Sequence, residues 1–160
     1  MIGAILSTVD VIGLGMLLGG GVYESVVMAP NYRSNLPQSL DYLRHFMTVT
    51  TPANFFRVVS PITMISLAAT LIVYWGFLPA RWWFIAALAA LILADSITYG
   101  FHYPRNKVLF IEEPLSSDIN MLRRLAQEWA TGNLVRIVLL AIATVMATYG
   151  IVSLVQIPVA

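Results

Sequence analysis

Four long apolar segments constrain the fold of this chain more than any other feature. They cover about residues 1–27, 54–77, 80–103 and 132–154, and a helix of roughly 20 residues is long enough to cross a bilayer. Only 11% of the 160 residues are charged, against about 25% in soluble domains. The sequence therefore predicts an all-α fold: an integral membrane four-helix bundle, formed by a single domain over 1–160, with the lipid bilayer as its surroundings.

The first segment has to be distinguished from a signal peptide. It has no positively charged residues ahead of its apolar run and no small-residue cleavage site after it, and a secretory signal has both. We therefore interpret residues 1–27 as the first membrane span, retained in the protein.

The connections between the four segments differ in length. Residues 78–79 leave room only for a tight turn, whereas residues 28–53 and 104–131 form long connections. Each long connection includes an amphipathic stretch, SLDYLRHFMTV in the first and SSDINMLRRLAQEWATG in the third. An amphipathic helix of this kind lies along the membrane surface, so we expect short interfacial helices in the first and third connections.

The positive charges indicate how the bundle is oriented. Eight of the nine Lys and Arg residues lie in the two long connections or at the adjoining helix ends, and only Arg81 lies on the opposite side. The positive-inside rule then predicts cytoplasmic long connections and both termini on the non-cytoplasmic side, in a bacterial inner membrane. A net charge of +1 gives no basic surface for nucleic acid, so we expect no nucleic-acid partner. A GxxxG motif, Gly15–Gly19, predicts close helix packing and leaves a homo-oligomer open.

Polar residues gather at the end of the bundle where the long connections lie. Asp95, Thr98 and His102 follow one another at helical spacing, which places them on one face of the third span. Trp129, Asn133 and Arg136 do the same on the fourth. We expect an inward-facing polar pocket there, with catalytic residues His102, Asp95, Glu24, Arg57 and Arg136 and substrate-binding residues Tyr23, Asn54, Phe56, Asn106, Trp129 and Asn133.

Charged side chains inside a membrane usually face the bundle interior and pair with each other. Asp95 is therefore expected to pair with Arg57 or Arg136, and Glu24 with the other arginine or with His102. The alternative is a purely structural cluster that fixes the helix register, as many buried ion pairs do.

A metal site is a further alternative for this cluster. His45, His102, Glu24 and Asp95 offer nitrogen and oxygen ligands that suit copper or iron. No HxxxH or ExxH spacing is present, and the absence of cysteine excludes thiolate ligands. We therefore assign no metal ligand and no cofactor from the sequence, and a copper or iron ion remains open.

Several short motifs together resemble one known family. They are GGGVYE with Pro30 six residues beyond its glutamate, PANFFR, FHYPRN and EWATGNLVR, and they resemble the anthrone oxygenase-like family of small four-helix membrane proteins. The resemblance implies a monooxygenase activity, since some relatives oxidise an anthrone methylene to a quinone carbonyl with dioxygen. The positions that the resemblance marks as shared are Tyr23, Glu24, Asn106, Trp129, Asn133 and Arg136.

Two classes of function therefore stay open. In the first, an oxidoreductase acts on a small aromatic, anthrone- or polyketide-like substrate: His102 is the base, Arg136 or Arg57 stabilises the resulting anion, and Trp129 and Phe56 line the slot with Tyr23. In the second, a non-enzymatic membrane protein binds or transports a small molecule or protons through the same cluster.

Overall fold

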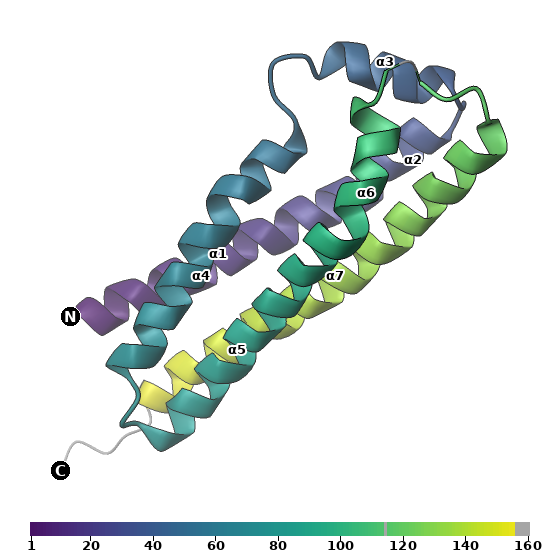
Figure 1. The fold of residues 1–160 in the computed structure, drawn as a ribbon. Coiled ribbons are helices and arrows are strands. Elements are labelled where there is room, and N and C mark those ends of the chain that lie inside the picture. Colours follow the sequence, from purple (N-terminus) through teal and green to yellow (C-terminus); the bar gives the residue numbers. More distant parts are fainter. Residues whose placement is uncertain (114, 156–160) are drawn as a thin grey trace.

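The computed structural model describes residues 1–113 and 115–155, which form helices and contain no strand. The first long helix comprises α1 (Ile2–Tyr23), the π-helical turn η1 (Glu24–Met28) and α2 (Ala29–Arg33); α3 (Gln38–Phe46) follows. Next comes α4 (Pro52–Val73), and then a helix built from α5 (Leu78–Ile97), η2 (Thr98–His102), α6 (Tyr103–Asn106) and η3 (Lys107–Ile111). The chain continues into α7 (Ile119–Val155). Figure 1 shows the long helices running side by side, with α3 across one end.

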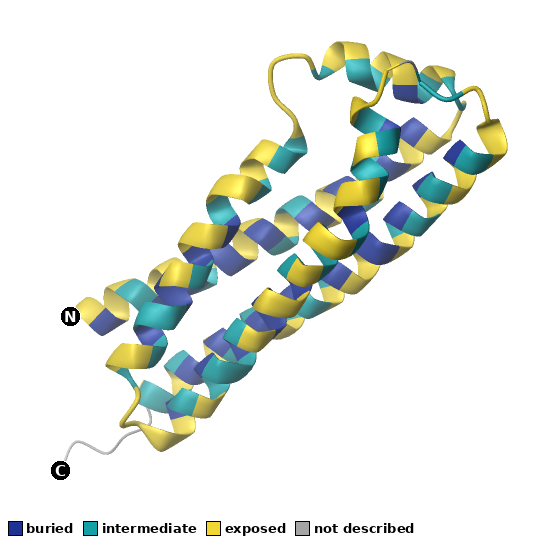
Figure 2. Cartoon of the chain, viewed as in Figure 1, coloured by how far each residue is buried: buried dark blue, intermediate teal, exposed yellow. Residues whose placement is uncertain are grey.

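Four of these helices are long and apolar enough to cross a membrane: Ile2–Arg33, Pro52–Val73, Leu78–Ile111 and Ile119–Val155. Many large apolar side chains point outward, among them Ile62, Ile65 and Val138, and the exposed residues follow the outer faces of the helices in Figure 2. An outer surface this apolar is suited to lipid rather than water. The expected all-α, integral membrane four-helix bundle is confirmed.

The third connection differs from our expectation. Instead of a separate interfacial helix followed by a span from residue 132, the chain forms the single helix α7, which runs through Gly132. Gly132 lies inside this helix although glycine weakens helix interiors. It faces η2, where a side chain would clash with Phe101. The interfacial helix of the first connection is present as α3.

The GxxxG motif of the first span does not pack against any described part of the chain. A methyl group added at Gly15 or Gly19 would meet nothing within 4 Å. Alanines provide the close helix approach instead, mainly Ala87 and Ala94 on α5 and Ala143 and Ala147 on α7. The two glycines therefore lie on the outer surface of α1.

A second apolar cluster lies beneath α3, apart from the core of the four spans. It includes Tyr32, Leu40, Leu109, Leu122 and Trp129. Arg44 fixes α3 over it by donating to the carbonyl oxygens of Val108, Leu109 and Glu112 at 2.7, 2.9 and 2.6 Å. These carbonyls end the third long helix, where backbone acceptors have no helical partner. The polar residues discussed below lie between the two clusters.

Candidate functional site

A buried ion pair joins the first span to the last. Arg136 Nη2 on α7 donates to Glu24 Oε2 at 2.9 Å, and the two side chains are only 6% and 10% exposed. The guanidinium also lies over the Phe56 ring, 4.4 Å from its centroid. Its Nε has no partner among the described residues. Because Glu24 balances its charge, Arg136 can stay ionised in an apolar setting.

Asn133 lies one helical turn before Arg136 and contacts the same part of the first span. Its Nδ2 donates to the Gly21 carbonyl at 3.0 Å and to Ser25 Oγ at 2.8 Å. The side chain is fully buried, and its Oδ1 has no partner in the described structure. An acceptor is therefore free beside the ion pair.

His102 is held edge-on against Trp129, with ring centroids 5.2 Å apart at 83°. Trp129 is fixed in turn, since its Nε1 donates to Asn106 Oδ1 at 2.6 Å. His102 Nδ1 is 3.4 Å from the Ile97 carbonyl oxygen, so the tautomer with its proton on Nδ1 donates to that carbonyl. His102 Nε2 is buried and has no hydrogen-bond partner within the described residues.

Two π-helical turns present the key side chains. Glu24 begins η1 and His102 ends η2. Pro30 and Pro104 follow these residues, and a proline cannot donate to the carbonyl four residues before it, which here belongs to Val26 or Gly100. Both carbonyls lie inside the π turns, so each turn coincides with a break in the α-helical hydrogen bonds caused by a proline. Such turns are frequent at functional sites.

Asp95 lies at the edge of this group. It is half-buried and accepts a hydrogen bond from Ser60 Oγ at 2.6 Å. Its closest polar partner is thus a hydroxyl group, and the expected ion pair with Arg57 or Arg136 is not formed. Glu24, by contrast, forms one of its expected pairs, with Arg136.

Three predicted site residues lie outside the cluster. Arg57 and Asn54 are exposed on α4, where Asn54 Nδ2 donates to Thr50 Oγ1 at 3.0 Å. Tyr23 is 55% exposed on the outer side of α1. The structure brings together the other predicted residues Glu24, Phe56, His102, Asn106, Trp129, Asn133 and Arg136.

Sequence reasoning missed a second ion pair beside the cluster. Arg105 Nη2 donates to Glu128 Oε2 at 2.7 Å, and the guanidinium lies 3.5 Å from the Phe101 ring centroid. The sequence did offer a signal for this pair. Arg105 directly follows Pro104 of the FHYPRN motif, and Glu128 directly precedes Trp129, a predicted site residue. Ser25 and Ser60 were missed because a serine in an apolar helix gives no distinctive pattern.

The hypothesis of a metal centre finds no ligand set here. Within residues 1–113 and 115–155, no three His, Asp or Glu side chains converge as metal ligands. His45 is exposed on α3, whereas Glu24 is engaged by Arg136 and Asp95 by Ser60.

Comparison with known proteins identifies the family. Residues 48–146, more than half of the chain, match the family model described as anthrone oxygenase. The chain belongs to the anthrone oxygenase family. The matched segment contains His102, Asn133 and Arg136, whereas Glu24 precedes it. No curated protein and no solved structure gives a significant match.

Proposed function

We propose that this membrane protein is an oxygenase that acts on a small aromatic, anthrone-like substrate with dioxygen. The observation that carries the proposal is the set of unpartnered polar atoms in the cluster: His102 Nε2, Asn133 Oδ1 and Arg136 Nε. Buried polar atoms without partners are rare in folded proteins. A base, an acceptor and a cation left without partners in one cluster are suited to a polar reactant.

The proposed reaction begins with proton removal. An anthrone methylene is acidic because its anion is delocalised over the aromatic rings and onto the carbonyl oxygen. His102 Nε2 takes the proton, and Arg136 stabilises the enolate-like oxygen. Glu24 acts through Arg136 by holding the guanidinium in place, so we regard it as a positioning residue.

Dioxygen then oxidises this electron-rich anion without another reductant. A carbon–oxygen bond forms at the former methylene, and the resulting peroxide takes up the proton held by His102. The second methylene hydrogen leaves as a proton while the oxygen–oxygen bond breaks. One oxygen atom remains as the carbonyl, and the other leaves as water, so the CH₂ group and O₂ become C=O and H₂O.

A largely apolar surface cavity at the same end of the molecule is where we expect such a substrate to enter. It has a volume of about 570 Å³ and lies between the end of α3 and the start of α4, lined by Phe46, Met47 and Phe55 among others. Phe55 packs edge-on against Phe56 at 5.1 Å, and Phe56 lies beneath Arg136. A flat aromatic molecule fits this series of rings.

Anthrone oxidation by the purified protein in lipid nanodiscs tests the proposal. The assay records anthraquinone absorbance and oxygen uptake, with spontaneous oxidation in empty nanodiscs subtracted. We expect His102→Ala to lower the rate by about 10²–10⁴-fold and Arg136→Gln by about 10²–10³-fold. Thr131→Ala, on the exposed side of α7, is the matched control. Full turnover by the His102 and Arg136 variants would contradict the proposal.

Proton movement through the bundle is a second candidate, favoured by a row of hydroxyl groups on α4. Ser60 bonds Asp95 at one end, and Thr70 Oγ1 donates to the fully buried Asp10 at 2.6 Å at the other. Thr63 is buried between them, and the row spans about 15 Å at 1.5 Å per residue. A proton flux into dye-loaded liposomes that Asp10→Asn abolishes would support this candidate, whereas liposomes as tight as protein-free ones would exclude it.

A further inference from the structure

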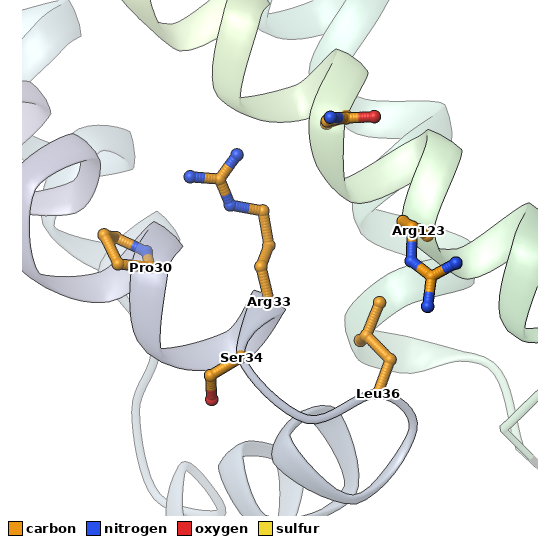
Figure 3. A pocket seen from close by; sticks show the side chains of 6 residues that line it. Pro30, Arg33, Ser34, Leu36 and Arg123 are labelled. Atoms are coloured by element: carbon orange, nitrogen blue, oxygen red, sulfur yellow. The ribbon is translucent and has the colours of Figure 1, made fainter.

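A basic cavity lies between the first and last spans, away from the cluster described above. It has a volume of about 300 Å³ and is lined by Pro30, Arg33, Ser34, Leu36, Arg123 and Gln127. Figure 3 shows Arg33 on α2 and Arg123 on α7 on either side of the space, with their guanidinium groups pointing in different directions and Leu36 below them. Two separate elements thus each contribute an arginine to the lining of one cavity.

The charge of this cavity is not balanced by its surroundings. None of its six lining residues is acidic. Within the described residues, Arg44, Arg105, Lys107 and Arg136 all form ion pairs with glutamates, but Arg33 and Arg123 do not. Arg33 Nε donates to the Ala29 carbonyl at 3.0 Å, which fixes the direction of its side chain. The cavity is therefore positively charged, and the hydrogen bond to Ala29 holds the Arg33 side chain in one orientation.

The position of the cavity favours one class of ligand. Arg33 is the last residue of the first membrane helix, and Arg123 lies in the first turns of the last. Both lie beyond the expected spans 1–27 and 132–154, on the side of the bundle where the long connections are, and we expect lipid phosphates to lie on this side within reach of their long side chains. Basic pockets between membrane helices bind lipid head groups, and guanidinium groups bind phosphate with paired hydrogen bonds.

We propose that this cavity binds a phosphate-bearing anion, with Arg33 and Arg123 as its two cationic ligands. The anion is either the head group of an anionic phospholipid or a soluble phosphate. Pro30 and Leu36 provide the apolar side on which a glycerol backbone packs. The inference is independent of the reaction proposed for His102, because none of the six lining residues belongs to that cluster.

Binding is measured by native mass spectrometry and thermal unfolding of the full chain in a neutral detergent. The probes are phosphatidylglycerol, phosphatidylcholine, glycerol phosphate and inorganic phosphate. For the wild type we expect phosphatidylglycerol to remain bound and to raise Tm, while phosphatidylcholine does neither. Arg33→Gln and Arg123→Gln should each weaken binding about tenfold, the loss of one charge-assisted contact.

Arg124→Gln is the matched control, since Arg124 is exposed like its neighbour Arg123 but does not line the cavity. Gln127→Glu places a negative charge in the cavity without removing an arginine, and it should abolish binding even if an arginine variant fails to fold. Binding of the lipid alone supports a head-group site, and equal binding of glycerol phosphate or inorganic phosphate supports a soluble ligand. Equal binding of phosphatidylcholine, or an equal loss in Arg124→Gln and Arg123→Gln, would overturn the proposal.

Discussion

Among single residues, Glu24 and Arg136 bear most directly on stability. Their side chains are nearly inaccessible, so removing one leaves the other as an unpaired buried charge. We expect Glu24→Gln to lower the free energy of unfolding by about 3–5 kcal/mol. The double variant Glu24→Leu/Arg136→Met should lose less than the two single changes together. Titration into denaturing mixed micelles measures these differences.

The exposed pair Lys107–Glu112 is the control for that experiment. Its atoms are 3.2 Å apart, with side chains 63% and 47% exposed, so Lys107→Gln should cost under about 1 kcal/mol. Equal losses for Glu24→Gln and Lys107→Gln would show that burial does not strengthen the Glu24–Arg136 interaction.

His45, outside the membrane spans, has its own expected pH dependence. The Asp41 carbonyl 2.8 Å from Nδ1, with the Asp41 carboxylate nearby, raises the pKa of His45 above its ordinary value of 6.5. Protonated His45 therefore stabilises α3 fully below pH 6.5, and this contribution is lost as pH rises through the folded-state pKa. NMR titration should show the raised pKa, reduced in Asp41→Asn but still above 6.5 because the backbone carbonyl remains. A pKa at or below 6.5 in the wild type contradicts this assignment.

Among the helices, α4 shows how far sequence patterns determine the site. The sequence analysis placed Asn54 and Arg57 on the inward side of this helix because they carry an amide and a charge, yet both are exposed. The buried polar positions of α4 all carry hydroxyl groups, which can be satisfied inside a membrane bundle at far lower cost than a guanidinium. They are Ser60, Thr63, Ser66 and Thr70. On the third and fourth spans, His102, Asn133 and Arg136 are buried, whereas Asp95 and Thr98, expected on the same face as His102, are only half-buried.

The contact between η2 and α7 depends on the absence of a side chain at Gly132. A Cβ there would lie 2.5 Å from Phe101 Cε1 and 3.2 Å from His102 Cε1. We expect Gly132→Ala to destabilise the protein by about 1–3 kcal/mol through overpacking and to displace the His102 ring. Thermal unfolding measures the loss, and the histidine NMR signals report the displacement.

Gly15→Ala provides the comparison, because a Cβ at that position meets nothing within 4 Å. Alanine is the better helix former, so this variant should be at least as stable as the wild type. If the two alanine variants were equally stable, the close packing of η2 on α7 would not be required. A selective loss of stability in Gly15→Ala would instead indicate a second copy packed on that face, which is the homo-oligomer left open by the sequence.

At the scale of the whole molecule, some features can be predicted from local sequence and others cannot. Membrane spans follow from local hydropathy, and the four-helix fold was predicted from it. The continuity of α7 and the contact of Arg44 with the end of the third helix depend on residues distant in sequence. The cluster around His102 is partly predictable. Helical spacing indicates which residues of one helix share a face, but the contacts between residues of different helices depend on how the helices are rotated against one another.

Membrane orientation is the remaining prediction for the assembled protein, and the absence of cysteine makes it directly testable. Asn35→Cys lies in the first connection and Gly76→Cys in the turn after α4, both at exposed positions. If the long connections are cytoplasmic, an impermeant maleimide should label Gly76→Cys in intact bacterial cells and Asn35→Cys only after the membrane is broken. Labelling of both variants in detergent is the control, because it shows that each cysteine can react when no membrane blocks the reagent. The reversed pattern would place Arg33, Arg123 and their cavity on the outer side, where the positive charge of eight Lys and Arg residues would oppose the membrane potential.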